Sequence, residues 1–324
     1  MPSGQRHPGL HLGLAYGVGV LVAAQSRITG ELSQLLGGST AAGLLAAAVS
    51  FGTGLVVLLL VVLPAGAARS AARRLPAAVR DGRLAWWMLL GGLGGASLVA
   101  CQGLAVPTLG VALFTVAVVA GQTASSLAVD AVGLGPGGVR TVTPTRVLAA
   151  ATATAAVGLA VSGRVSAGTL SVGLVALVAV AGGLTAAQQA VNGRVAVATG
   201  EPLVAALVNF TVGTTALVVA FAVSAGGSRP NPGDLPPPWD RPLLWLAGPI
   251  GVLFIVTAAV VVRTLGVLLF GLLAVAGTLT GSLVLDVVLP TPGTEVTWRV
   301  VAGVLLTGVA VAVAAVLPVR GSGP

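Results

Sequence analysis

Amide side chains occur at matching places in two similar stretches of this sequence. Gln25 lies in AAQSRITGELSQLLG (23–37), Gln188 lies in AAQQAVNGRVAVATG (186–200), and the two stretches align without a gap. The second stretch also carries Asn192 where the first has a threonine. An amide both donates and accepts hydrogen bonds, so these residues are suited to bind a polar group.

A second pair of matching stretches places an aromatic ring beside a polar side chain. VSFGTG (49–54) aligns with VNFTVG (208–213), and the matched residues are Ser50 with Asn209 and Phe51 with Phe210. A phenylalanine face can stack on a flat or cationic group. Packing in an apolar core is the more frequent role of such a residue.

The composition indicates which elements must position these residues. Of 324 residues, 56% are hydrophobic and 7% are charged, and the mean hydropathy is +1.04. A soluble domain has about 25% charged residues. Apolar segments of about 20 residues recur along the chain, each long enough to cross the ~30 Å hydrocarbon core of a bilayer as a helix. The sequence therefore predicts an all-α integral membrane protein.

Other classes of function lack the residues they need. The two histidines, His7 and His11, lie near the N-terminus and Cys101 is the single cysteine, so no metal site is expected. No nucleotide-binding loop and no catalytic Ser–His or paired-Asp arrangement occurs, so we expect no cofactor and no enzyme activity. The sixteen arginines mostly flank apolar segments, where lipid headgroups and not nucleic acids are the expected partners.

Ten segments are expected to cross the membrane, joined by short Gly/Pro-rich connections and by two longer polar ones at 64–84 and 225–241. The segments are 10–34, 40–63, 85–105, 108–130, 145–162, 168–190, 203–224, 242–262, 265–288 and 298–318.

The chain consists of two similar halves. TLGVALFTVAVVAGQTASSLAVD (108–130) recurs as TLGVLLFGLLAVAGTLTGSLVLD (264–286), with 12 identical pairs among the 23. We therefore divide the chain into a first five-helix repeat, 1–165, and a second, 166–324. A period this long indicates two copies of a folding unit and not a solenoid.

Five is an odd number of crossings, so the second repeat must enter the membrane from the side opposite to the first. The halves are then inverted, as in transporters that work by alternating access. With the N-terminus in the cytoplasm, eleven of the sixteen arginines fall on the cytoplasmic side and five fall outside. The positive-inside rule thus predicts a multi-pass protein of the inner (plasma) membrane with both termini cytoplasmic.

The motifs resemble those of a known superfamily. Its features here are paired five-helix halves, a Gln-x-x-x-Asn-Gly element (Gln188, Asn192, Gly193), GGLGG (91–95) and the T-L-G-x-x-L-F…A-G…S-L-x-x-D fourth helix. They look like the drug/metabolite transporter (DMT) superfamily, and most like its YdcZ-like branch of unknown function. The resemblance covers nearly the whole chain and implies the EamA/DMT-like fold of two inverted five-helix repeats. It implies no substrate, and the first half departs from the pattern by lacking an equivalent of Asn192.

Polar residues at membrane depth form the candidate solute site, because such residues are costly in hydrocarbon and usually face the interior of a bundle. The candidates are Gln25, Ser50, Phe51, Gln102, Gln122, Gln188, Asn192, Asn209 and Phe210. The alternative role for each amide is a hydrogen bond between helices, worth about 0.6 kcal/mol on average in membranes.

Two acidic residues end the repeated helices, and each precedes an arginine that opens the next helix. The predicted structural ion pairs are Asp130 with Arg146 and Asp286 with Arg299. The alternative for these charges is contact with lipid headgroups. Glu31 is the one carboxylate that could lie inside a segment, and a nearby arginine argues against its use in proton coupling.

The expected function is secondary transport: export of a small organic metabolite or drug-like solute by rocking of two inverted halves, with coupling to a proton or sodium gradient as an open possibility. The expected partners are the lipid bilayer, the solute and a second copy of the chain in a homodimer. Two alternatives stay open, a membrane scaffold or subunit that transports nothing and a lipid-handling protein. A polar cavity between the halves would favour transport, a fully packed interface the scaffold, and a lateral opening lipid handling.

Overall fold

In the computed structural model the chain is a bundle of long helices, and the residues described form no strand. The structure describes residues 8–161, 172–224, 230–288 and 298–316, except for the side chains of 8, 102–104, 106–113, 160–161, 286, 300 and 313–316. The long helices are α1 (Pro8–Leu35), α2 (Thr40–Val62), α5 (Gly92–Ala131), α6 (Pro144–Val161), α7 (Val172–Thr199), α8 (Pro202–Val223), α9 (Ala247–Val288) and α10 (Trp298–Val316). The short ones are α3 (Gly66–Arg73), α4 (Leu75–Arg80), η1 (Trp86–Gly91), η3 (Pro232–Asp234) and η4 (Pro242–Trp245).

Several of these helices have the length and composition of membrane spans. Within the described part of the chain six stretches qualify: Gly9–Leu35, Thr40–Val62, Phe114–Ala131, Val172–Thr199, Pro202–Val223 and Pro242–Leu285. The last has 44 residues, about twice what one crossing needs. This agrees with the membrane protein expected from composition, whereas the count of ten crossings stays a prediction.

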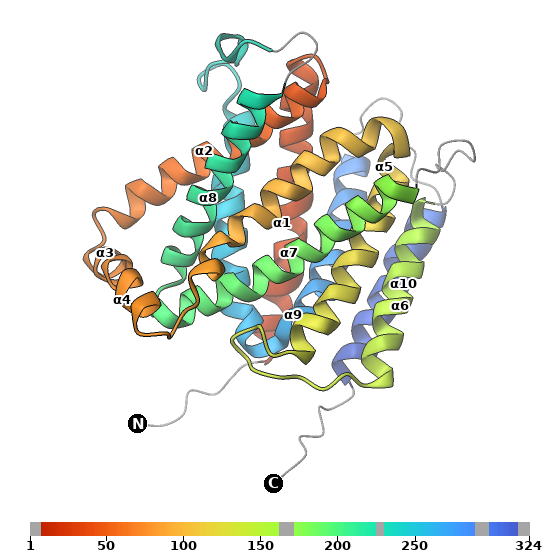
Figure 1. Cartoon of the computed structure of the whole chain (residues 1–324). Coiled ribbons are helices and arrows are strands. Elements are labelled where there is room, and N and C mark those ends of the chain that lie inside the picture. Colours follow the sequence, from red (N-terminus) through yellow and green to blue (C-terminus); the bar gives the residue numbers. More distant parts are fainter. Residues whose placement is uncertain (1–7, 162–171, 225–229, 289–297, 317–324) are drawn as a thin grey trace.

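Two predicted pairs of helices are single long elements. α5 covers the segments expected at 85–105 and 108–130, and α9 covers those expected at 242–262 and 265–288. Figure 1 shows that both double back: α5 rises and then descends, whereas α9 descends and then rises. Each element therefore consists of two arms.

The turn of α9 falls at Gly266, whose φ of 79° and ψ of 172° place it in a region open to glycine and hardly to any other residue. The first half differs at the matching place. Gly110 lies inside α5, and helical structure continues through Pro107, so the connection expected at 106–108 is not a separate loop.

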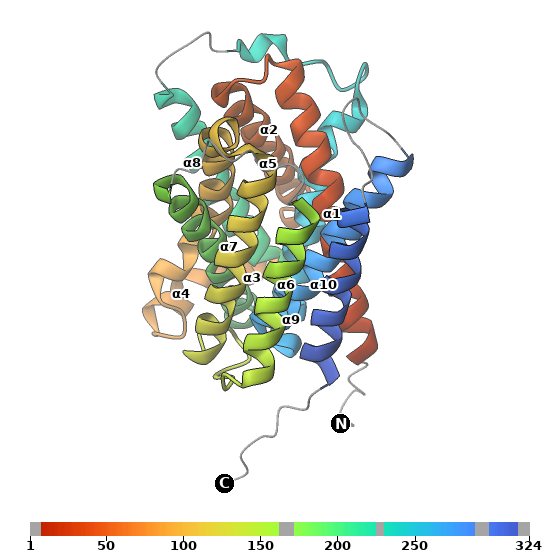
Figure 2. The same ribbon diagram turned by 90° about the vertical axis from the view of Figure 1, so that its right-hand side faces the viewer.

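The most extensive helix contacts exchange partners between the halves. α1 packs along α9, and α7 packs along α5. Of the other helices, α2 packs on α8, and α6 packs on α10. Figures 1 and 2 show α6 and α10 side by side. Because each of these contacts joins one half to the other, both halves contribute to a common core.

Matching glycines permit this close packing. A Cβ on Gly19 of α1 would lie 2.0 Å from the carbonyl oxygen of Ala274, and a Cβ on Gly182 of α7 would lie 2.3 Å from that of Val118. Gly182 matches Gly19, and Val118 matches Ala274, in the repeat alignment. The same backbone contact is thus made twice, by small residues of the kind that let helices approach closely in membranes.

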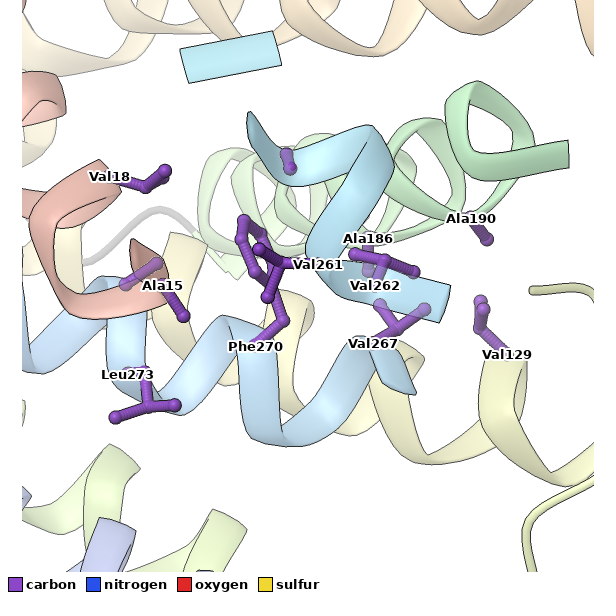
Figure 3. Close-up of a cluster of buried hydrophobic side chains, with 12 residues drawn as sticks. Ala15, Val18, Val129, Ala186, Ala190, Val261, Val262, Val267, Phe270 and Leu273 are labelled. Atoms are coloured by element: carbon purple, nitrogen blue, oxygen red, sulfur yellow. The ribbon is translucent and has the colours of Figure 1, made fainter. Parts of the chain in front are cut away.

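Apolar side chains from four helices meet where α9 turns (Figure 3). Val261 and Val262 lie on its first arm and Val267 and Phe270 on its second, and Phe270 is fully buried. The other helices contribute Ala15 and Val18 of α1, Val129 of α5, and Ala186 and Ala190 of α7. Elements of both halves therefore hold this turn in place.

The bundle has two distinct ends. α1 begins and α10 ends at the same end, whereas η3 and η4 lie at the opposite end (Figures 1 and 2). Glu31, near the end of α1, forms a 3.7 Å ion pair with Arg241 beside η4, and Arg74, between α3 and α4, donates a 3.3 Å hydrogen bond to Thr199 O at the end of α7. We call these the η4 end and the α3–α4 end; α1 terminates at the first and α7 at the second. Which of them is cytoplasmic stays a prediction.

Candidate functional site

Three of the predicted polar residues form one buried cluster. Asn209 Oδ1 of α8 accepts hydrogen bonds from Gln188 Nε2 (2.7 Å) and Asn192 Nδ2 (3.1 Å) of α7. Gln188 and Asn192 are four residues apart and therefore share a helix face. All three side chains are at most 5% exposed. We call these residues the amide cluster.

Backbone from the other half covers the amide cluster. The GGLGG stretch joins η1 to α5, and a Cβ on Gly94 would lie 3.0 Å from Gln188 Oε1. A Cβ on Gly92 would lie 2.2 Å from the carbonyl oxygen of Asn209. Glycine is required because any side chain there would displace the amides.

The first half contains a matching but looser arrangement. Gln25 Nε2 donates to Ser50 Oγ at 3.4 Å; Ser50 is buried, whereas Gln25 is half-buried. Its glycine cover comes from the start of α9, where a Cβ on Gly248 would lie 2.3 Å from Ser50 O and one on Gly251 would lie 2.7 Å from Gln25 Nε2. We call Gln25 and Ser50 the Gln25–Ser50 pair.

The two phenylalanines meet between these polar groups. The rings of Phe51 and Phe210 are tilted by 39° with centroids 5.1 Å apart. Each ring also packs on a glycine of the opposite half: a Cβ on Gly54 would lie 2.2 Å from Phe210, and a Cβ on Gly213 would lie 2.4 Å from Phe51. Gly54 and Gly213 match in the repeat, so this contact is reciprocal as well.

Two candidates fall elsewhere. Gln122 lies in α5 on the side of α9, where a Cβ on Gly271 would be 4.0 Å from its Nε2, and not in the amide cluster. The side chain of Gln102 lies outside the described residues. The structure thus brings together seven of the nine residues, and their role in binding a solute stays a prediction.

Asp130 is the most buried of the charged residues described. Its carboxylate is 2% exposed and forms an ion pair with Arg146, the partner expected from the sequence. Its oxygens also accept from the backbone amides of Val267 (2.8 Å) and Leu268 (3.1 Å). These amides follow the turn at Gly266, so Asp130 caps the N-terminus of the second arm of α9.

Two further arginines extend this contact. Arg140 Nη2 donates to Thr264 O at 2.7 Å, and Arg194 of α7 donates to Leu134 O (3.0 Å) and Gly133 O (2.6 Å). Burial lowers the pKa of Arg140, and the nearby Asp130 carboxylate acts in the opposite direction. We call Asp130, Arg140, Arg146 and Arg194 the Asp130 network. It ties the connection between α5 and α6 to α7 and α9.

The matching charges of the second half are only partly described. The side chain of Asp286 lies outside the described residues, and Arg299 places its guanidinium carbon 5.6 Å from the centroid of the Trp298 ring. The predicted Asp286–Arg299 pair is therefore untested.

An apolar groove of about 550 Å³ opens on the side of the bundle towards the η4 end. Its lining is Val49, Gly52, Thr53, Val56, Val57, Leu235, Trp245 and Pro249, and almost all of the exposed lining is apolar. Ser50 of the Gln25–Ser50 pair and Gly248 immediately adjoin lining residues in the chain. The groove thus lies beside the looser of the two polar arrangements.

Long apolar helices in two matching halves, with amides gathered between them, indicate a multi-pass membrane protein. A family model described as "Putative inner membrane exporter, YdcZ" matches residues 10–159 and 173–313. The chain belongs to this YdcZ family, as its motifs suggested, and is a multi-pass inner-membrane protein.

Comparison with solved structures agrees on the fold. One structure, titled only as the crystal structure of a protein, matches with a TM-score of 0.65 and 19% identity. The match covers 97% of this chain and 98% of the other. No curated protein matches the sequence.

Proposed function

We propose that the protein is a secondary transporter that exports a small organic solute across the inner membrane by alternating access between two inverted halves. Membership of a family described as inner membrane exporters supports the class. One observation supports the mechanism. In each half, matching polar residues meet matching glycines of the opposite half, but the hydrogen bonds between the polar residues are shorter in the amide cluster than in the Gln25–Ser50 pair.

The two polar arrangements belong to opposite ends of the bundle. Gly92 is the first residue of α5, which follows the α3–α4 segment, whereas Gly248 is the second residue of α9, which follows η4. The amide cluster under Gly92 is therefore nearer the α3–α4 end, and the Gln25–Ser50 pair is nearer the η4 end. Inverted halves that exchange their shapes would loosen one arrangement while tightening the other.

The difference in hydrogen-bond length between the two polar arrangements corresponds to one state of such a cycle. The amide cluster has two buried hydrogen bonds of 2.7 and 3.1 Å, whereas the Gln25–Ser50 bond is 3.4 Å and adjoins the groove. We assign this to a state closed at the α3–α4 end. That end carries the arginine-rich 64–84 segment, so the positive-inside rule predicts that it is the cytoplasmic end.

The test is efflux from proteoliposomes loaded with a metabolite panel, with and without a pH or sodium gradient. Gln188→Ala removes one of the two hydrogen bonds to Asn209 Oδ1, which is worth about 0.6–1.7 kcal/mol in membranes, so efflux should fall ~3- to 20-fold. Gln189→Ala is the matched control. Gln189 is as buried as Gln188, and its Oε1 has no hydrogen-bond partner among the described atoms, so alanine there removes a buried amide without removing a bond of the amide cluster. Gln189 is one turn before Gly193, whose Cβ would face Pro136 and the Ala259 carbonyl and not the amide cluster.

Wild-type vesicles that release every solute no faster than protein-free vesicles, under each gradient, would contradict the proposal. Equal loss in Gln188→Ala and Gln189→Ala would contradict the role of the amide cluster.

The apolar groove favours a second candidate, a lipid-handling protein. Its lining and lateral position suit an acyl chain, and Gly52 lies in it with no atom within 4 Å of an added Cβ. Under this alternative Gly52→Trp blocks transbilayer movement of a fluorescent phospholipid, whereas Gln188→Ala does not. Under the transport proposal, wild-type vesicles move the phospholipid no faster than protein-free ones.

A further inference from the structure

We infer that the exported solute is uncharged and carries an amide-like hydrogen-bonding group beside a flat apolar part. This inference rests on the transport function proposed above and specifies its substrate class.

The groups that meet between the halves are all neutral. The amide cluster and the Gln25–Ser50 pair contribute amides and one hydroxyl, and Phe51 and Phe210 contribute two ring faces between them. Such groups recognise a solute by hydrogen bonds and by apolar contact, not by charge.

One of these groups is unsatisfied. Asn209 is 1% exposed, and its Nδ2 has no hydrogen-bond partner among the described atoms, although its Oδ1 accepts two hydrogen bonds. A buried donor without a partner is destabilising, because it has lost its hydrogen bonds to water. A carbonyl oxygen of a solute would pair with it. An amide suits the cluster best, because it supplies a donor for the neighbouring oxygens as well.

A cationic solute would find no counter-charge there among the carboxylates that the structure describes. The chain has eight carboxylates. Those described are Glu31, Asp81, Asp234 and Asp240 at exposed positions, Glu201 at the N-cap of α8, and Asp130 in its network. The remaining two come late in the sequence: Asp286 near the end of α9 and Glu295 beyond it.

The two rings alone do not suit a cation. An unpaired ion in a protein interior is strongly disfavoured, even after relaxation of its surroundings. Phenylalanine holds a cation less well than tryptophan does, and the described carboxylates lie away from Phe51 and Phe210. The ring faces suit a flat neutral group.

An anionic solute would lack its usual partner too. Transporters with broken helices bind anionic groups at the N-terminus of the half-helix, where backbone amides are free. Here the amides of Val267 and Leu268 after the turn of α9 already donate to Asp130. The arginines nearest the site in sequence are also engaged: Arg27 donates to Leu285 O at 3.3 Å, and Arg194 donates to Gly133 O and Leu134 O.

The test loads proteoliposomes with small-molecule extract of the expressing cells, separated by ion exchange into neutral, cationic and anionic fractions. Wild type, Gln188→Ala and Gln189→Ala are compared, and released compounds are followed by mass spectrometry. We expect at least one compound of the neutral fraction to leave at least ~3-fold faster from wild-type and Gln189→Ala vesicles than from Gln188→Ala vesicles.

Three other results have distinct meanings. A cationic or anionic compound whose release depends on Gln188 would overturn the inference and leave transport standing. Release that does not depend on Gln188 for any compound would also overturn the inference and leave transport standing. Wild-type vesicles that release no compound of any fraction faster than protein-free vesicles would overturn the proposed function itself. Gln188→Asn shortens the side chain but keeps the amide, so it gives a second test in case the alanine variant misfolds. This variant should release the same neutral compound at an intermediate rate. Release of charged compounds as fast as neutral ones from this variant would overturn the inference.

Discussion

Replacing Asp130 by alanine tests whether one carboxylate secures the turn of α9. The change removes the ion pair with Arg146 and the acceptor of the Val267 and Leu268 amides together. Breaking a buried ion pair by removing one partner costs about 3–5 kcal/mol, and losing an N-cap costs about 0.5–2 kcal/mol.

The two contributions share atoms and therefore do not add. Arg146 is 14% exposed, and after the change it keeps hydrogen bonds to the carbonyl oxygens of Arg140 and Thr141. Its charge is therefore partly compensated, and the cost of breaking the ion pair falls at the lower limit of the range above. We expect Asp130→Ala to lower the free energy of unfolding by about 3 kcal/mol, or ~150-fold in the folding equilibrium constant. Asp130→Asn should lose about 1–2 kcal/mol, because asparagine caps a helix nearly as well but carries no charge.

The assay is equilibrium unfolding in mixed detergent micelles, followed by helical circular dichroism. Asp81→Ala is the matched control, since Asp81 is 56% exposed and its 3.4 Å pair with Arg83 lies on the surface. The control should change the free energy of unfolding by less than about 1 kcal/mol. If Asp130→Ala falls within that same range, the Asp130 network does not hold α9 as argued.

Three more predictions concern the turn and the interface between the halves. Gly266→Ala should lower the free energy of unfolding by about 1–3 kcal/mol in the same assay, because the φ of Gly266 is +79°. The control Gly52→Ala, in open space on α2, should change the free energy of unfolding little. Equal effects of the two substitutions would contradict the role of the positive φ. Gly213→Ala should slow solute efflux about 5-fold or more, because its Cβ would overlap the ring of Phe51; wild-type efflux from this variant would separate the ring contact from transport. Asn192→Thr gives the second half the residue of the first and removes a hydrogen bond from the amide cluster, so the α3–α4 end should close less firmly. In the variant with Ser50→Cys, the rate at which a thiol reagent added at the η4 end labels this cysteine should fall about threefold. Unchanged labelling would refute the assignment of the closed end.

The positions of most helices could be predicted because their signals are local. α1 (Pro8–Leu35) and α2 (Thr40–Val62) lie within two residues of the segments expected at 10–34 and 40–63. Both depend on apolar length and on the turn at Gly37 and Gly38, where φ is positive. α7 runs to Thr199, well past the expected end at 190. Its last two turns contain polar residues that hydrocarbon would reject, and the partners that satisfy them are far away in sequence.

The polar site could be predicted only in part. Matching positions in the two halves pointed to Gln25, Ser50, Gln188 and Asn209, because a duplicated fold brings equivalent residues into equivalent surroundings. The capping of α9 by Asp130 left no such signal. Its partners are backbone amides 137 and 138 residues away, and backbone groups have no sequence identity to recognise.

The differences between the halves matter as much as their likeness. Under the transport proposal, the matching glycines and rings make the two end states of the cycle similar in packing, so the apolar contacts favour neither state. The polar contacts are unequal by sequence, since the amide cluster contains Asn192 and Asn209 where the first half has Thr29 and Ser50. One additional hydrogen bond between helices is worth about 0.6–1.7 kcal/mol in membranes, which is a bias of ~3- to 20-fold between two states. Under the transport proposal, duplication supplies the two shapes, and later substitution at two matched positions decides which of them the empty protein adopts.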